Sequence, residues 1–253
     1  MGASLPHELL DEILSYLSPD DEQGRRSLRN CSLVAKSWTN PSRRHFFKTV
    51  EIWETTLQSW LDTIPPGNDE LLQHVRSLSY IATWRPAHRI KVLQDYFPSL
   101  YRLQHLSLSS VHIPSDISRQ VEMFSAFDAL SHLTLKYCKV TISALVTLIN
   151  CFSNLDRLDL NHLLHEMDGK PSSPLSRPLI RKLHLSGFPK DGLGILYQLS
   201  ELGPAFDELV IDCWSRVPRP ILSSIVDSLG INAKCIRLLR FSGMCTYKYE
   251  NSL

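Results

Sequence analysis

LSHLTLKYCKV, at residues 130–140, holds the pattern that decides the fold of this chain. Leu130, Leu133 and Leu135 alternate with polar residues, as expected for a strand that has one buried face. Cys138 and Val140 continue the apolar pattern beyond the strand. One unit of this kind cannot cover its own apolar face, so the stretch predicts further copies that pack beside it.

The same spacing of apolar residues recurs along the chain. Copies begin at residues 47, 75, 103, 130, 155, 180, 206 and 236, so successive copies start 25 to 30 residues apart. Helix-like stretches follow some of the strands, as at residues 142–152 and 220–229. An ordinary doubly wound α/β sheet would not need the same signature in every strand at one period. We therefore expect stacked βα units with a parallel sheet.

These copies resemble degenerate leucine-rich repeats, and Cys138 stands where that family has Asn or Cys. The other copies have Val111, Leu163, Phe188 and Trp214 at that position, so we expect their turns to be organised differently. Residues 165–178 are rich in Pro and Ser and predict a loop in place of a helix. Only a short tail follows the last copy, which leaves open whether the array is incomplete or the protein is naturally short.

The N-terminal segment has a different pattern. LPHELLDEILSYL, at residues 5–17, predicts a helix with Pro6 in its first turn and a wide apolar stripe. Residues 18–21 should end this helix and cap a second, short one that reaches about Asn30. A third helix is expected over Cys31–Trp38, ended by Pro41. Three short helices cannot bury so much apolar surface among themselves, so this segment predicts a partner.

Three blocks of this segment, LPxEL at residues 5–9, ILxxL at 13–17 and CSLVxKxW at 31–38, resemble the F-box. The resemblance covers about residues 4–48, although the link between its first two helices is longer and more charged than usual. It implies binding to the Skp-type adaptor of a cullin-based ubiquitin ligase. The same side chains could instead pack the module against its neighbour, which the sequence leaves open. Carried over by position, the implied adaptor contacts are Leu5, Pro6, Leu9, Ile13, Leu14, Leu33, Val34 and Trp38.

The sequence therefore predicts an α/β protein with a three-helix F-box module at residues 1–46. This module is fused without a linker to a leucine-rich-repeat-like solenoid at residues 47–253. The resemblance implies a non-catalytic substrate receptor of a Skp–cullin–F-box ubiquitin ligase. The alternatives are a scaffold that binds the adaptor without ubiquitin transfer, and an enzyme with an unrecognised site.

Alternation along the strands places one set of polar residues on the exposed face of the sheet, in rows across neighbouring repeats. Basic residues gather in this set, which suggests a site for an acidic or phosphorylated target segment. Acidic residues are interspersed with them, so an ordinary solvated face of mixed charge is the competing interpretation. The candidate target-binding residues are His132, Lys136, Arg157, Asp159, Lys182, His184 and Asp212.

Charge, cysteines and motifs exclude several other classes. The chain has 27 Lys and Arg residues against 26 Asp and Glu residues, so we expect no binding to nucleic acid or membrane. It shows no secretory signal and no apolar run that would span a bilayer, so a cytoplasmic or nuclear location is expected. Its 6 cysteines form no CxxC pair. Because common catalytic and phosphate-binding motifs are also missing, we expect no catalytic residues, no metal and no cofactor.

Overall fold

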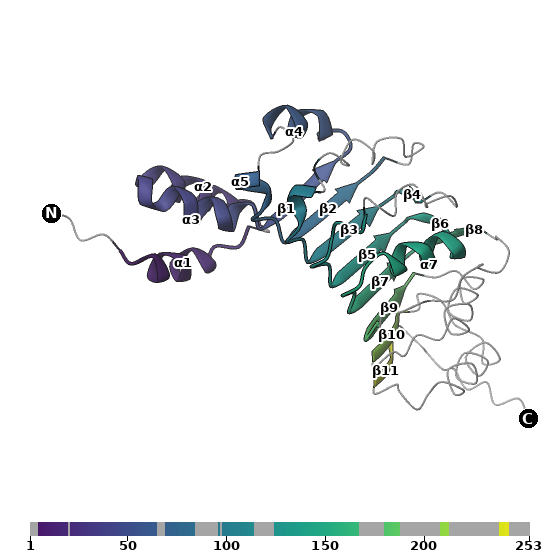
Figure 1. Ribbon diagram of the computed structural model, residues 1–253. Helices are drawn as coiled ribbons and strands as arrows, with labels where there is room; N and C mark the ends of the chain where they lie inside the picture. The colour runs from purple at the N-terminus through teal and green to yellow at the C-terminus, as the bar shows by residue number, and fades with distance from the viewer. Residues whose placement is uncertain are drawn as a thin grey trace, which may run out of the picture.

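The computed structural model describes residues 5–19, 21–64, 69–83, 96, 98–113, 124–166, 180–187, 208–212 and 238–242. Three helices form the N-terminal part: α1 (His7–Ser15), α2 (Glu22–Val34) and α3 (Lys36–Phe46). Strands follow directly, since β1 (Thr49–Trp53) begins soon after α3 ends. The helical module lies at the β1 end of a large sheet, and β11 (Leu238–Ser242) lies at its other end (Figure 1).

The first two helices begin and end for local reasons. Pro6 precedes α1, where its missing N–H costs no helical hydrogen bond. Asp21 caps α2, because its side chain accepts a hydrogen bond of 2.6 Å from the Gly24 backbone N–H. The predicted stop between these helices is therefore confirmed.

The predicted position of the third helix is wrong. Cys31–Val34 form the last turn of α2. The helix ends there, because Ala35 has extended backbone angles. The third helix α3 then runs through Pro41 to Phe46. Pro41 cannot donate the hydrogen bond expected inside a helix, but its ring is buried, so packing outweighs the local cost.

The large sheet contains one strand from each predicted copy of the apolar pattern. All neighbouring strands are parallel and follow one another in chain order. The register aligns Leu106 with Leu133 and Leu133 with Leu158, so the apolar residues form continuous rows. Besides β1 and β11, the strands are β2 (Ser77–Ile81), β3 (His105–Ser109), β5 (His132–Lys136), β7 (Arg157–Asn161), β9 (Lys182–Ser186) and β10 (Glu208–Asp212).

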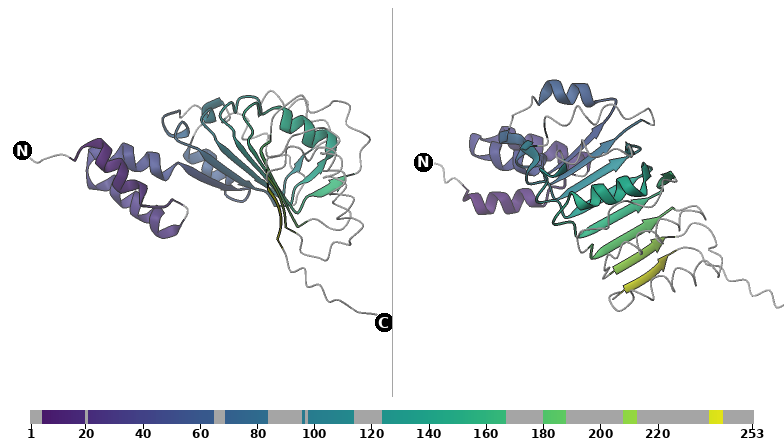
Figure 2. Two further views of the ribbon diagram at one scale, coloured as in Figure 1. Left: turned by 90° about the horizontal axis from the view of Figure 1, so that it is seen from below. Right: turned by 45° about the vertical axis from the view of Figure 1, so that its right-hand side comes forward.

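The apolar face of this sheet is covered by short elements. A second parallel sheet has the order β4 (His112–Ile113), β6 (Lys139–Thr141), β8 (Leu164–Glu166). The helix expected from residue 142 is present as α7 (Ile142–Asn150), capped by Thr141. Side chains from α7 join the same core as the strand leucines, and Figure 2 shows α7 over one face of the sheet. Two shorter helices, α4 (Leu57–Thr63) and α5 (Asp69–Leu72), follow β1.

The loop predicted after β7 is partly replaced by a strand. The predicted loop at residues 165–178 overlaps strand β8 at its beginning, so that part of the prediction is wrong. The strand is held by parallel pairing with β6, which a local composition rule does not detect. The predicted helix at residues 220–229, the side chains of Phe188 and Trp214, and the tail beyond residue 242 lie outside the described residues.

The turns after β3, β5, β7 and β9 share one geometry, although the sequence predicted different turns. Ser110, Tyr137, His162 and Gly187 each follow a strand directly, and their φ angles lie between 52° and 68°. This left-handed conformation turns the chain out of the large sheet. The next residue is buried in every described copy, whether it is Val111, Cys138 or Leu163. Any apolar side chain of suitable size therefore fills that position.

Two separate hydrophobic cores meet at the junction between module and sheet. Leu10, Leu14 and Leu28 form the core of the helical module, and the strand leucines form the other. Phe46 packs on the first core and Phe47 on the second, with ring centroids 5.2 Å apart. Within the described parts of the chain, no helix has the length and apolar character needed to cross a membrane.

Candidate adaptor-binding and target-binding surfaces

The helix α1 has two apolar sides with different environments. Leu10 and Leu14 point into the module and are almost fully buried. Leu9, Ile13 and Tyr16 are between 46% and 79% exposed, and their spacing places them along one outer side of the helix. Leu5, just before the helix, extends this row. An exposed apolar row of this length is costly in water and is typical of an interaction surface.

The end of α2 offers a second exposed apolar group. Leu33 is 78% exposed and Val34 is 68% exposed, directly before the break at Ala35. Because α2 stops here, both side chains stand at the edge of the module and do not enter its core.

The predicted adaptor contacts therefore divide into groups. Leu14 is buried in the module core with no exposed surface, so we remove it from the contact set as a correction. Trp38 is half-buried and packs against the same core. Tyr16 was missed, although its position three residues after Ile13 on the same helix side could have identified it. The predicted contacts that are exposed are Leu5, Pro6, Leu9, Ile13, Leu33 and Val34.

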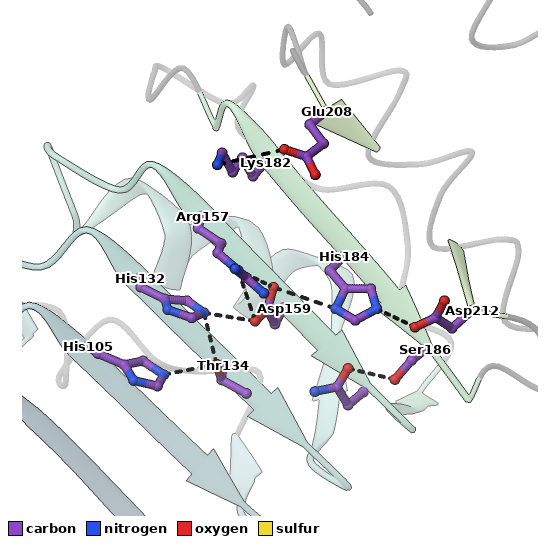
Figure 3. Close-up of polar contacts among 11 residues, drawn as sticks. His105, His132, Thr134, Arg157, Asp159, Lys182, His184, Ser186, Glu208 and Asp212 are labelled. Carbon is purple, nitrogen blue, oxygen red and sulfur yellow. Dashed lines mark hydrogen bonds and ion pairs between the residues drawn. The ribbon is translucent and has the colours of Figure 1, made fainter. Parts of the chain in front are cut away.

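The opposite face of the large sheet from the core, here called the polar face, carries the predicted rows of polar residues. The rows are observed in the strand register: His105 pairs with His132, and Thr134 pairs with Asp159. Hydrogen bonds connect these rows sideways from strand to strand (Figure 3). His105 Nδ1 lies 3.2 Å from Ser77 Oγ, and its Nε2 lies 3.1 Å from Thr134 Oγ1.

Asp159 is the centre of this network. Its side chain is 9% exposed, and it accepts hydrogen bonds from His132 Nε2 at 2.8 Å and from Arg157 Nε at 2.9 Å. Burial alone would raise the pKa of this carboxyl, but the donors from His132 and Arg157 outweigh burial, and the pKa is lowered. The hydrogen bond to Asp159 in turn raises the pKa of Arg157. Asp159 is thus held as a carboxylate.

The two ends of the network differ in their partners. The rings of His105 and His132 are stacked, with centroids 4.0 Å apart. Burial, followed by the charge of His132, lowers the pKa of His105 to about 4. At the other end, His184 Nε2 donates to Asp212 Oδ2 at 2.6 Å, and His184 Nδ1 lies 3.9 Å from Asp159 Oδ1.

A hollow of about 290 Å³ opens on the polar face over β7, β9 and β10. Arg157, Lys182, His184 and Asp212 line it, so the structure brings together these predicted target-binding residues. Leu183 also lines the hollow. Glu208 and Val210 complete the lining and were not among the predicted residues. The register alone could have identified both, since they pair with Lys182 and His184.

The remaining predicted residues lie beside the hollow or apart from it. His132 and Asp159 support its wall through Arg157, as described above. Lys136 lies over the ring of Tyr137, with its Nζ 5.5 Å from the ring centroid, and it joins no part of the network that the structure describes. The predicted basic patch therefore consists of paired charges, because Arg157 and Lys182 each lie near a carboxylate.

The contacts of His132 differ from those of a catalytic triad. In a hydrolase triad the histidine uses one ring nitrogen for the acid and the other for the nucleophile. Here His132 Nε2 faces both Asp159 and Thr134 Oγ1, at 2.8 and 3.3 Å, so proton transfer through the ring is not set up. Among the described residues, no group of at least three His, Cys, Asp or Glu side chains is placed to hold a metal ion.

Comparison with known proteins identifies the class of the helical module. A family model for F-box-like domains matches residues 3–50, which covers α1 to α3 and the start of β1. No curated protein matches the chain. The protein thus carries an F-box-like domain at its N-terminal end, a kind of domain that commonly serves as an adaptor-binding module.

Proposed function

We propose that this protein is the substrate-recognition subunit of a Skp–cullin–F-box ubiquitin ligase. The helical module binds the Skp-type adaptor, and the polar face of the sheet binds the target protein. The observation that carries the proposal is the exposed apolar row Leu5, Leu9, Ile13 and Tyr16 inside the segment that matches F-box-like domains. The protein itself is non-catalytic in this proposal, and it acts by holding the target near a ubiquitin-charged enzyme.

The repeat region is proposed to be a leucine-rich-repeat-like solenoid that runs from residue 47. Two observations support it: the strands follow one another in chain order, and the same left-handed turn recurs after β3, β5, β7 and β9. In such an array each unit contacts its neighbours, so the polar rows form one extended surface for a protein partner. We place the complex in the cytoplasm or nucleus.

The adaptor surface can be tested by co-purification with a Skp-type adaptor. Leu9→Asp and Leu33→Asp each place a charge in one of the two exposed apolar groups, and we expect each to lose ~2 kcal/mol or more of binding free energy. Leu164→Asp is the matched control, because Leu164 is 46% exposed but lies on the second sheet. Unchanged binding in both module variants would refute the adaptor-binding role.

A scaffold that binds the adaptor without ubiquitin transfer would pass that first test. Target turnover measured with and without cullin activity separates the two functions. A ligase subunit predicts that the target accumulates when the cullin is inhibited or when Leu9→Asp breaks the adaptor contact. A scaffold predicts unchanged target levels in both conditions.

A further inference from the structure

The hollow over β7, β9 and β10 offers hydrogen-bond donors to an incoming group. Arg157 uses its Nε to hold Asp159, and its terminal nitrogens have no hydrogen-bond partner among the described residues. Lys182 Nζ lies 3.7 Å from Glu208 Oε2, which is an ion pair without a close hydrogen bond. These two side chains are 45% and 52% exposed, the highest values among the charged residues of the lining.

The acceptors of the hollow are less available than its donors. Asp212 uses Oδ2 to accept from His184, and its Oδ1 is buried, with no hydrogen-bond partner among the described residues. Asp159 lies behind Arg157 and is almost fully buried. Glu208 is the one carboxylate of the lining whose engagement is loose, through its distant pair with Lys182. A group that enters the hollow therefore meets donors first.

Arg157 is also oriented in advance. The buried carboxylate of Asp159 holds its Nε, and His132 fixes Asp159 from the other side. The free edge of the guanidinium, formed by its two terminal nitrogens, matches the two oxygens of a carboxylate or phosphate. An arginine fixed in this way loses little side-chain entropy when it binds an anion.

We propose that this hollow binds an anionic group of the target protein, a carboxylate or a phosphate, through Arg157 and Lys182. Asp159 acts as a positioning residue for Arg157. That the anion belongs to a target protein rests on the function proposed above, whereas anion binding itself does not depend on the adaptor. Glu208 occupies Lys182 in the free protein, and the anion of the target displaces it.

The role of Glu208 gives the proposal its sharpest test. Glu208→Gln removes the competing carboxylate, so it should tighten anion binding about two- to fivefold. If the hollow instead took a basic side chain, Glu208→Gln would weaken binding, because it would remove an acceptor for that cation. The two ligand classes thus predict opposite signs.

The experiment follows the side-chain Nε–H signal of Arg157 by NMR in the full chain. This signal is assigned by its loss in Arg157→Gln. The probes are N-acetylglutamate N-methylamide, the corresponding phosphoserine compound and N-acetyllysine N-methylamide, each titrated at constant ionic strength. The carboxylate and phosphate arms separate an acidic residue from a phosphorylated one, and the lysine arm tests the cationic alternative.

We expect saturable shifts with at least one anionic probe and none with the lysine probe. Arg181 and Asp156 form a matched control pair, 2.6 Å apart and outside the hollow. Because Arg157→Gln removes its own signal, binding is also followed at the ring of His184, which lines the hollow. Arg157→Gln should abolish the shifts at this ring, and Arg181→Gln should leave them unchanged. Asp159→Asn should weaken binding of the anionic probe and shift the Arg157 Nε–H signal. Asp156→Asn should change neither.

Three results would overturn the proposal. The first is the absence of a saturable shift with either anion. The second is an equal loss of anion binding in Arg157→Gln and Arg181→Gln, and the third is weaker anion binding in Glu208→Gln. None of them bears on the adaptor, which is measured separately by co-purification. The site and the proposed function can therefore fail independently.

Discussion

At the scale of single residues, the polar face places titratable groups in environments that favour one protonation state. His105 is held neutral mainly by burial, with its pKa lowered to about 4. Asp159 is held ionised by donors that outweigh its burial. Both effects make the folded state bind protons less readily than the unfolded chain does, so both stabilise the fold at neutral pH and are lost in acid.

The two residues act over different pH ranges. An unfolded histidine has a pKa of about 6.5, so the contribution of His105 declines as the pH falls from there to about 4. The contribution of Asp159 is present above the unfolded value of about 3.9 and is lost below it. We therefore expect Tm to fall between pH 6.5 and 4, and His105→Gln to flatten this decline. Thermal unfolding by circular dichroism measures it, and identical slopes in variant and wild type would contradict the assignment.

The two sides of α1 should separate stability from binding. Leu14→Ala removes a fully buried side chain, so we expect it to cost ~2–5 kcal/mol of unfolding free energy. Leu9→Ala alters an exposed side chain, so it should change the unfolding free energy by less than ~0.5 kcal/mol. It should nevertheless weaken binding to the adaptor. Urea unfolding gives both free energies. Equal destabilisation by the two changes would show that α1 does not divide into an inner and an outer side.

At the scale of elements, the recurring turn fixes how β3, β5, β7 and β9 leave the large sheet. Ser110, Tyr137 and His162 adopt a left-handed conformation that costs an ordinary residue roughly 1 kcal/mol or more. Gly187 adopts it without that cost. Gly187 has a second constraint, because a Cβ there would lie 2.2 Å from the His162 ring.

Gly187→Ala should therefore be destabilising for two separable reasons, backbone strain and a clash with His162. We expect a total loss of about 2–4 kcal/mol. Combining it with His162→Ala removes the clash and leaves the strain, so the double variant should lose less than the sum of the two single changes. A double-mutant cycle from urea unfolding tests this expectation, and strict additivity would contradict it.

The elements also show which features the sequence could and could not predict. The strands and polar rows followed from one repeated spacing, because a parallel sheet in register turns that spacing into rows. The boundary between α2 and α3 could not be found, since apolar spacing continues across Ala35 and only the backbone breaks there. The role of Asp159 depends on donors from two strands, β5 and β7, which the composition of the face does not reveal. Composition therefore suggested a basic patch where the structure has paired charges.

At the scale of the whole molecule, the helical module and the sheet are joined by contacts on both sides of one peptide bond. Phe46 belongs to the module core and Phe47 to the sheet core. The next carbonyl, that of Lys48, accepts hydrogen bonds of 2.9 and 3.0 Å from the backbone N–H groups of Arg76 and Ser77. The two cores therefore meet directly where the helical module passes into the first strand pair, with no linker between them.

The two phenylalanines should be energetically coupled. Edge-to-face aromatic pairs contribute ~0.5–1.5 kcal/mol beyond their burial, so we expect a coupling energy of that size between Phe46→Ala and Phe47→Ala. Urea unfolding of the single and double variants measures it. Phe124 and Phe127 form a pair within the sheet core alone, so their coupling energy, measured in the same way, is the matched control for a pair away from the junction. A coupling energy near zero would indicate two units that move independently.

The left-handed turns also link each strand to the strand that follows it in the chain. The N–H groups of Ser110, Tyr137 and His162 each donate to a carbonyl at the end of the following strand, at 2.8 Å. The N–H groups that open the strands donate the other way, as His105 does to Arg76. Each of these strands therefore opens on a carbonyl of the preceding repeat, and its turn is completed by a carbonyl of the following strand. Removing one strand would thus leave the turn before it without its acceptor, so the effect of a deletion reaches back into the preceding repeat.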